Sequence, residues 1–484
     1  MKKPGIYILI VGTVFVLLAA ALTLLPRPRY SELERRDLTA FPQLTARSLA
    51  DGSFTSGVST WFSDTEPFRD VLLQGAMWIR DKAGIVLGED QIRFHAGDAE
   101  MPEDPEPEAE TTEESDSLQA YQREGGADEF AKIASAGIVI MGKGENVRAL
   151  MGFFAGNKYG FSYAEAVNRY HRALGDSVRI YCMPIPTSTE YYLPEGVSKK
   201  IKKQWPVIEN IFNSLEEGVK PVNIYNVLAK HVDEPIYLRT DHHWAPLGAY
   251  YAARKFAEVA DVPFRDLSHY KADTVHRYVG TMYMYSKDMA VKKAPEDFIW
   301  YEPTDAQYTT SYIYYGLCKQ YHITGESPWK EGKYFFPRKD GEASAYQVFM
   351  NADGVVCRVR TEVGNGRRLI ILKDSFGNAV PGYLFYSFDE IHIIDCRYFT
   401  KNMVQYVKDN HITDILFANN TGACCADMFI SNYKKFLTQK GYSYCHVDHD
   451  KEEAEKAAAE AAAAAESAGS APAPAAGEAA ASAE

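Results

Sequence analysis

Clustered basic residues are missing from this chain of 484 residues. Asp and Glu number 65 against 52 Lys and Arg, which gives a formal net charge of −13 at pH 7. Because no basic stripe is present to replace the counterions of a phosphate backbone, we do not expect the chain to bind nucleic acid. Much of the acidity is local, since residues 98–116 hold ten acidic residues and no basic one. The net charge therefore describes a linker more than a binding site.

Cysteine is too irregularly spaced to predict a disulfide framework or a metal cluster. The seven cysteines are an odd number and include no C-x-x-C pair. Cys182 and Cys396 lie inside apolar runs, where a buried small hydrophobic residue is the simpler interpretation. The adjacent Cys424 and Cys425 have no neighbours that indicate a reactive thiol. We expect neither a metal ion nor a cofactor.

The N-terminus holds the one long apolar run. It extends from Ile6 to Leu25, follows two lysines and ends at Pro26. Twenty such residues can span a bilayer, and they exceed the usual apolar length of a signal peptide. The run predicts that residues 1–26 form a signal anchor; an uncleaved one is favoured, and cleavage at the small residues Ala19, Ala20 and Ala21 is the alternative. The chain is then expected to be a single-pass cell-membrane protein whose bulk is extracytoplasmic.

Composition divides the rest of the chain. Residues 27–96 are interpreted as a membrane-proximal lead-in, and the Pro/Glu-rich residues 97–118 as a disordered acidic loop. Residues 451–484 are an Ala/Glu/Pro tail without an apolar stripe. The folded domain is expected at 119–450, and hydrophobic residues, 46% of the chain, are sufficient for its core.

Short apolar runs alternate with helix-period segments in this domain. The expected strands lie at 138–141, 178–183, 369–372, 390–394 and 414–418. This β-α-β rhythm predicts an α/β fold, a parallel sheet with helices on both faces. Between its two halves, the Tyr-rich residues 277–349 lack a helical period and are interpreted as an insertion near the site. Their aromatic rings could stack on sugars, but a β-rich core is favoured roughly two to one.

Two short segments contain the residue types of a nucleophilic site. The first is T-D-H-H-W-A-P at 240–246, where Pro246 is typical of the first position of a helix. Asp241 and His243 are two residues apart in a loop, so they can share a face while His242 points elsewhere. An Asp that faces a His fixes its tautomer and stabilises the imidazolium. The alternatives are a helix N-cap and a metal site, and the metal site lacks further ligands at suitable spacing.

The second segment is I-I-L-K-D-S-F-G at 370–377, an apolar strand that ends in D-S. A hydroxyl just beyond the carboxyl end of a buried strand stands at the edge where open α/β folds place their sites. Ser375 is therefore the candidate nucleophile, and His243 is the base that it requires. The backbone N–H groups of Ser375 and Gly377 are candidates for an oxyanion hole. A plain strand-to-helix cap is the alternative for D-S.

Polar residues near two other strand ends are weaker candidates. Asn420 could donate its amide to an oxyanion, although Asn is ordinary in a strand-ending turn. Arg397 could contact a substrate oxygen, although an Arg at a surface turn usually has no special role.

The combination of T-D-H-H-W with a strand ending in D-S-F resembles the DHHW family of bacterial envelope proteins. It is also similar to the exported alginate O-acetyltransferase subunits, which carry T-D-x-H-W and G-D-S-F in this order. The resemblance covers most of residues 62–448 and implies an SGNH-hydrolase-like fold. It implies Ser375 as nucleophile, His243 as general base and Asp241 as the residue that orients it. Lys373 departs from the acetyltransferases, which have Gly there, and this puts the oxyanion hole in doubt.

Three functions are compatible with the resemblance. In the first, an O-acetyltransferase takes an acetyl group onto Ser375 and passes it to a sugar hydroxyl of an exopolysaccharide or wall polymer. An integral-membrane acyl donor protein is then implied as a partner. In the second, a deacetylase or esterase uses the same residues with water as acceptor. In the third, the chain is a non-catalytic protein that binds or assembles an envelope polymer.

Overall fold

The structure is a computed structural model that describes residues 12–16, 25–31, 36–45, 48–49, 52–73, 75, 118–121, 132–133, 137–156, 159–193, 201–318, 322–351 and 353–445. The predicted tail, and all but the last residue of the predicted acidic loop, lie outside these residues.

The predicted membrane placement is contradicted by the structure. A helix needs about 20 apolar residues to cross a bilayer, and among the described residues no helix is long and apolar enough to do so. Of the apolar run at 6–25, only 12–16 lie in a described helix, and most of the remainder is outside the described residues. The prediction of a single-pass membrane protein with an extracytoplasmic bulk is therefore wrong on this finding.

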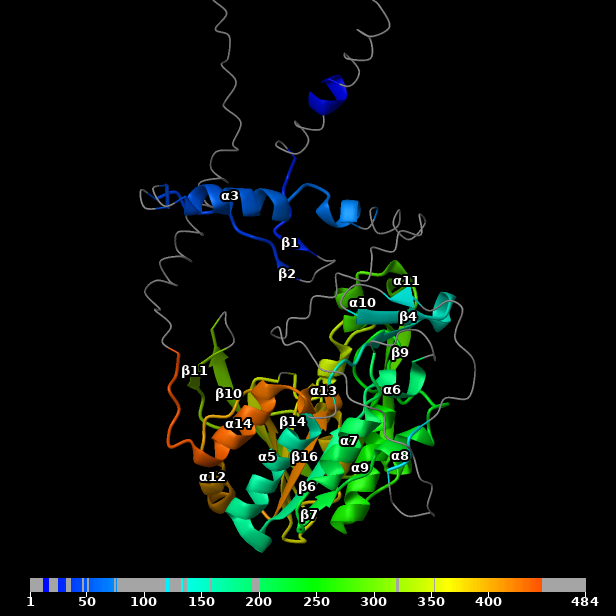
Figure 1. Ribbon diagram of the computed structural model, residues 1–484, viewed down its shortest axis with the longest axis vertical. Helices are drawn as coiled ribbons and strands as arrows, with labels where there is room; N and C mark the ends of the chain where they lie inside the picture. The colour runs from blue at the N-terminus through cyan, green and yellow to red at the C-terminus, as the bar shows by residue number, and fades with distance from the viewer. Residues whose placement is uncertain are drawn as a thin grey trace, which may run out of the picture.

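A nine-stranded mixed sheet forms the centre of the described fold (Figure 1). Its strands are β6 (Arg179–Ile185), β7 (Val219–Pro221), β10 (Tyr308–Leu317), β11 (Ile323–Glu326), β12 (Lys330–Gly332), β13 (Val355–Thr361), β14 (Arg368–Lys373), β15 (Glu390–Asp395) and β16 (Asp414–Asn420). The order across the sheet is β11-β10-β13-β15-β14-β16-β6-β7, and β12 also pairs with β10. The neighbours from β15 to β7 are all parallel, whereas β13, β10, β11 and β12 pair antiparallel. The predicted α/β class is confirmed, but the sheet is mixed and not wholly parallel as predicted, because β13, β10, β11 and β12 extend it with antiparallel pairs.

The central strands are apolar on both faces because both faces are covered. In β14, alternate side chains enter different cores, Leu369 and Ile371 on one side and Ile370 and Leu372 on the other. The first core includes α9 (Pro246–Ala260), and the second includes α5 (Tyr159–Leu174), α12 (Met403–Asp409) and α14 (Asp427–Thr438). Helix α7 (Trp205–Asn213) contributes to both cores through Ile208 and Val207.

One predicted strand belongs to another sheet. Strand β4 (Ile138–Met141) pairs antiparallel with β3 (Lys132–Ile133) and β5 (Arg148–Met151), not with the central sheet. Only a short turn separates β4 from β5, and such a connection can join antiparallel strands but not parallel ones. The β-α-β rhythm therefore begins later in the chain than the sequence pattern indicates.

The Tyr-rich residues 277–349 contribute to two sheets. Their first part extends the hairpin of β8 (Tyr270–Tyr278) and β9 (Glu296–Pro303), with α10 (Thr281–Ser286) and α11 (Met289–Lys292) between the strands. Their second part supplies β10, β11 and β12 to the central sheet. Most large rings here are buried, whereas Tyr285 and Tyr314 are each 40% exposed.

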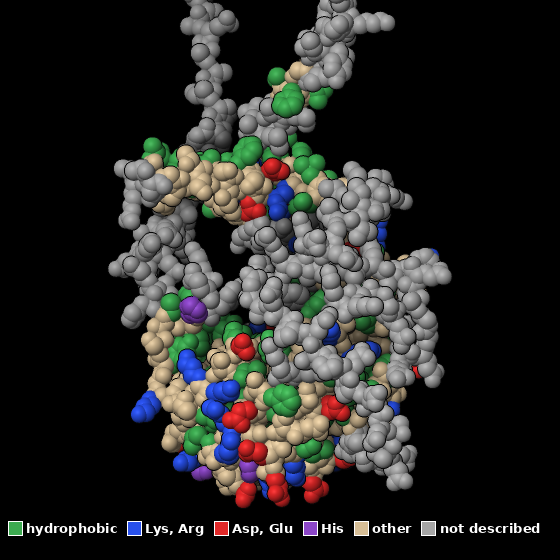
Figure 2. Space-filling model, in the orientation of Figure 1, with side chains coloured by type: hydrophobic (Ala, Val, Ile, Leu, Met, Phe, Trp, Pro, Cys, Tyr) green, Lys and Arg blue, Asp and Glu red, His purple; other side chains and the backbone are tan. Residues whose placement is uncertain are grey.

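Short elements complete the described fold. They are β1 (Tyr30–Ser31), β2 (Arg36–Asp37), α3 (Ser53–Asp64), α6 (Ser188–Tyr192), α8 (Tyr225–Ala229) and α13 (Thr421–Cys424). On the face drawn in Figure 2, basic and acidic side chains of the lower part of the molecule are intermingled.

We expect the central sheet to tolerate truncation poorly. Ile415 lies in β16 and is fully buried, so Ile415→Ala should lower the free energy of unfolding by about 2–5 kcal/mol. Ile299 in β9 is 38% exposed, and the matched Ile299→Ala should cost about 0.5 kcal/mol. Chemical denaturation measures both values. Equal losses for the two variants would contradict this placement of the core.

Candidate active site

The loop before α9 holds two buried polar side chains in mutual contact. Asp241 is 1% exposed and His243 is 6% exposed. One carboxylate oxygen of Asp241, Oδ1, accepts the backbone N–H of His243 at 3.0 Å and lies 2.7 Å from Nδ1 of its ring. This arrangement favours the tautomer in which Nδ1 carries the proton and Nε2 is an acceptor.

The turn after β14 brings a hydroxyl to that acceptor. Ser375 begins a short 3-10 helix, Ser375–Ala379, whose cap is Asp374, because the Asp374 carboxylate accepts the Phe376 N–H at 2.8 Å. The Oγ of Ser375 lies 2.8 Å from Nε2 of His243. The structure thus places a hydroxyl, an imidazole and a carboxylate in one hydrogen-bonded row, at the carboxyl end of a central parallel strand.

The second oxygen of Asp241 is held by the Tyr-rich region. Its Oδ2 accepts the Tyr278 hydroxyl at 2.7 Å, the Thr281 N–H at 2.8 Å and the Thr281 hydroxyl at 3.0 Å. Burial alone would raise the pKa of Asp241, but His243, with smaller contributions from His242 and the Thr281 N–H, holds it well below its ordinary value of 3.8. Gly280 allows this approach, since a Cβ there would lie 2.4 Å from the Asp241 carboxylate.

Aromatic side chains connect the two motif segments. The Tyr346 ring stacks on the His243 ring at 3.8 Å between centroids, with 5° between the planes. The carbonyl oxygen of Phe376 accepts two hydrogen bonds, from Trp244 Nε1 at 2.9 Å and from the Tyr346 hydroxyl at 3.0 Å. Tyr346 and Trp244 therefore connect the loop that holds His243 to the turn that carries the Ser375 hydroxyl. The sequence offered only the Trp of T-D-H-H-W as a signal for this.

His242 has a different environment from His243. Its Nδ1 contacts the Thr281 hydroxyl at 2.6 Å, and its ring lies 3.8 Å from the His243 ring. Burial, with the neighbouring His243, lowers the pKa of His242 to about 3, although 24% of its side chain remains exposed. His242 thus stays beside the other two residues, 3.6 Å from the Asp241 carboxylate, whereas the sequence predicted that it would point elsewhere.

The predicted oxyanion donors differ in whether they already have a hydrogen-bond acceptor. The Gly377 N–H donates to the carbonyl oxygen of Asp374 at 3.0 Å, so it is occupied inside the turn. The Ser375 N–H has no acceptor among the described residues. Asn420 is the cap of α13 through Oδ1, and its backbone N–H donates to the Asp374 carboxylate at 2.7 Å. Of the two predicted main-chain donors, the Ser375 N–H is the one left available in the described structure.

Lys373 and Arg397 belong to a partly buried charge network, in which Lys373 and Asp395 are buried and Arg397 and Asp353 are partly exposed. The Lys373 ammonium is 3.0 Å from the Asp395 carboxylate and 3.6 Å from that of Asp353. Arg397 contacts the same two carboxylates, at 2.8 Å and 3.1 Å. Burial alone would lower the pKa of Lys373, but the two carboxylates raise it above its ordinary value. The predicted substrate contact of Arg397 must therefore compete with two ion pairs.

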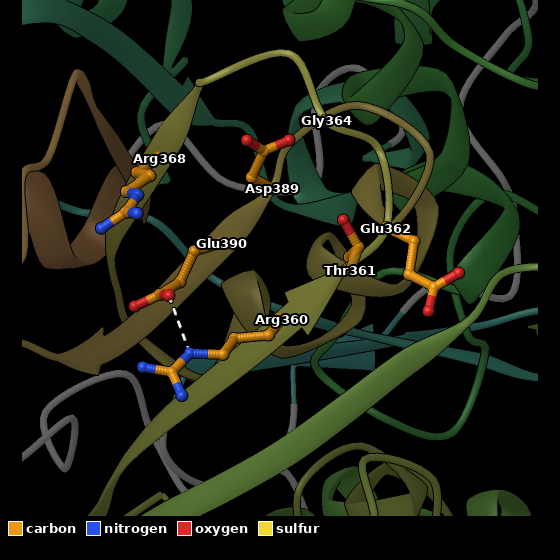
Figure 3. Close-up of a pocket in the computed structure, with 7 residues that line it drawn as sticks. All are labelled: Arg360, Thr361, Glu362, Gly364, Arg368, Asp389 and Glu390. Carbon is orange, nitrogen blue, oxygen red and sulfur yellow. Dashed lines mark hydrogen bonds and ion pairs between the residues drawn. The ribbon is translucent and has the colours of Figure 1, made fainter.

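Two other places were candidates for a ligand. The atoms of Asp241, His242 and His243 lie within 4.8 Å of one another, as metal ligands would, but the Asp241 and His243 atoms already have the partners given above. A hollow of about 410 Å³, drawn in Figure 3, is lined by Arg360, Glu390 and neighbouring residues. It lies at the amino ends of β14 and β15, the sheet edge opposite Ser375.

Comparisons with known proteins match the part of the chain that contains Asp241, His243 and Ser375. The sequence profile of the DHHW protein family matches residues 34–101 and 148–394, more than half of the chain. A crystal structure of a DHHW family protein from Eubacterium siraeum is 34% identical, with a TM-score of 0.57, over 64% of this chain and 100% of that one. Bacillus cereus PatB1 with a sulfonyl adduct is 19% identical, with a TM-score of 0.49, over 62% and 99%. The O-acetyltransferase domain of Pseudomonas putida AlgJ is 11% identical, with a TM-score of 0.36, over 63% and 99%. Comparison with curated protein sequences gives no match.

The depressed pKa of Asp241 predicts an acid-sensitive stability. A carboxyl whose pKa is lower in the folded chain stabilises the fold above its ordinary value of 3.8, and this contribution is lost as the pH falls through the folded value. Asp241→Asn should therefore show a shallower loss of stability than wild type below about pH 4. Denaturation at a series of pH values measures the difference. Asp176→Asn, at a carboxylate that is 99% exposed, is the control and should follow the wild-type curve.

Proposed function

Because this chain belongs to the DHHW family, we propose that it transfers an acyl group through Ser375 to a hydroxyl of a polysaccharide. The observation that carries the proposal is the row of contacts in which His243 lies 2.8 Å from the Ser375 hydroxyl and 2.7 Å from Asp241. Nucleophile, base and orienting carboxylate in hydrogen-bond contact are the arrangement that acyl transfer requires. The family resemblance adds an SGNH-hydrolase-like domain as the proposed scaffold.

Acylation would proceed in two proton-balanced stages. As Ser375 Oγ attacks the acyl carbonyl of the donor, Nε2 of His243 accepts the hydroxyl proton. Asp241 stabilises the imidazolium through its contact with Nδ1. When the tetrahedral species collapses, the donor's leaving oxygen or sulfur takes the proton from His243, and an acyl ester remains on Ser375.

Deacylation would repeat these steps with the acceptor. A sugar hydroxyl gives its proton to His243 and attacks the ester carbonyl, and the departing Ser375 oxygen then recovers that proton. The exposed ring of Tyr285 supports a sugar as the acceptor, because it lies 5.9 Å from the His242 ring and can stack on a pyranose. Water in the same position would make the chain an esterase.

The oxyanion hole is the weakest part of the proposed machinery. With the Gly377 N–H occupied, the Ser375 N–H requires a second donor. We assign this role to the side-chain amide of Asn420, whose backbone N–H contacts the Asp374 carboxylate beside the turn. That amide belongs to a residue whose Oδ1 is fixed by the α13 cap, which restricts how it can turn. We therefore assign to Asn420 a supporting contact and leave Arg397 to its carboxylate partners.

The two adjacent histidines provide a matched test of the proposed base. With a chromogenic acetyl ester as donor, Ser375→Ala and His243→Gln should each lower kcat/KM by roughly 10³-fold or more, since both remove a member of a concerted unit. His242→Gln should have a small effect, because its ring contacts Thr281 and not Ser375. Initial rates of ester cleavage and circular dichroism of each variant are the measurements.

Adding an acceptor oligosaccharide then distinguishes the products. A transferase acetylates the oligosaccharide faster than it hydrolyses the ester, which mass spectrometry of the sugar detects. Release of acetate alone would select the esterase. Turnover that survives Ser375→Ala in folded protein would sink both enzymatic functions and leave the polymer-binding alternative.

A further inference from the structure

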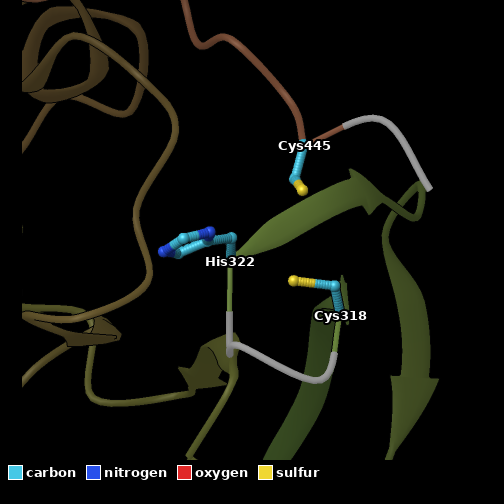
Figure 4. Close-up of side chains that lie close together, drawn as sticks. All are labelled: Cys318, His322 and Cys445. Atoms are coloured by element: carbon cyan, nitrogen blue, oxygen red, sulfur yellow. The ribbon is translucent and has the colours of Figure 1, made fainter. Parts of the chain in front are cut away.

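A second cluster of chemically capable side chains lies where the end of the described chain meets the β10–β11 hairpin. Cys318 directly follows β10, His322 directly precedes β11, and Cys445 lies at the end of the described C-terminal segment. Figure 4 shows the three side chains arriving from these three segments. They belong neither to the row of Ser375, His243 and Asp241 nor to either core.

Backbone hydrogen bonds bring the three segments together. The Cys318 N–H donates to the carbonyl oxygen of His322 at 3.0 Å, and the Cys445 N–H donates to that of Ile323 at 2.9 Å. The cysteines are half-buried and the histidine is exposed, so solvent ions have access. One ligand atom of each residue lies within 4.8 Å of the other two.

Two thiolates and one imidazole are a ligand set suited to zinc. Zn–S bonds of about 2.3 Å in tetrahedral geometry place two ligand sulfurs roughly 3.8 Å apart, so small side-chain rotations would suffice here. A disulfide would use the two sulfurs alone and give no role to His322. The histidine beside both thiols therefore favours a metal over a disulfide.

We propose that Cys318, His322 and Cys445 bind a Zn²⁺ ion, with water in the fourth position, and that the ion fastens residues 441–445 to the β10–β11 hairpin. Cys445 lies more than a hundred residues from Cys318 and His322 in the sequence, so binding lowers the free energy of the folded chain relative to the unfolded one. The carboxyl end of β10 points to the same sheet edge as that of β14, three strand positions away, roughly 15 Å. The ion thus stabilises the rim of the proposed active site without entering it.

Cobalt is the probe that distinguishes metal binding at this site from metal binding elsewhere on the chain. The full chain, reduced with a phosphine, is titrated with Co²⁺, whose thiolate complexes absorb by sulfur-to-metal charge transfer. One Co²⁺ per chain with this absorption is expected, displaced by Zn²⁺. Cys318→Ser and Cys445→Ser should abolish the absorption. His322→Gln should weaken binding by at least about tenfold, since loss of an outer-sphere partner alone costs roughly 10–100-fold.

Controls keep the test decisive. His276→Gln removes another exposed histidine and Cys425→Ser another cysteine, and both should bind Co²⁺ like wild type. Zn²⁺ should raise the thermal midpoint of wild type and of both controls, and not that of the ligand variants. Cobalt bound without the thiolate absorption, as at Asp241 and His242, would overturn the proposal. A reduced chain that binds no cobalt would also overturn it. The same holds if Cys318 and Cys445 form a disulfide before reduction and the reduced chain then binds no cobalt.

Discussion

The hydrogen bond between His243 and Ser375 joins segments 132 residues apart, and the surrounding structure positions its two ends. At one end, the Asp241 carboxylate fixes the imidazole in the plane while Tyr346 covers its face. At the other end, β14 delivers the hydroxyl, and the cap by Asp374 determines the direction of the turn. Displacement of either segment by an ångström would break the contact, because a hydrogen bond tolerates only a few tenths.

Burial of so many charged groups requires that each be compensated. Asp241 is ionised at a position that is 1% exposed because three donors and the adjacent imidazole offset the loss of water. Beside the turn, Asp395 is fully buried and is matched by Lys373 and Arg397. Lys373 precedes Asp374 at this turn, and its ammonium is directed into the network. A Cβ at position 377 would lie 2.4 Å from the Cβ of Lys373, so only glycine fits at that position.

Local patterns in the sequence predicted the α/β class and selected Asp241, His243 and Ser375, whose side chains the structure brings into hydrogen-bond contact. Strand ends and helix starts are set by nearby residues, such as Pro246 at the start of α9 and the apolar run that becomes β14. The partners of Asp241 were not predictable in this way. Tyr278 and Thr281 reach the carboxylate only because the β8–β9 hairpin folds over the loop, a long-range contact without a spacing rule. The same limit applies to Cys445, which meets Cys318 only through tertiary structure.

The turn that presents Ser375 also restricts what the site can do. A 3-10 turn uses the Gly377 N–H for its own hydrogen bond, so the developing oxyanion would face the Ser375 N–H with one main-chain donor instead of two. Loss of one such donor typically costs about 10²–10³-fold in rate. A site of this kind depends more on the orientation of its base and on its acceptor than on electrostatic stabilisation. In the proposed acyl transfer, an acceptor sugar held beside His243 would supply that orientation, which unordered water would not.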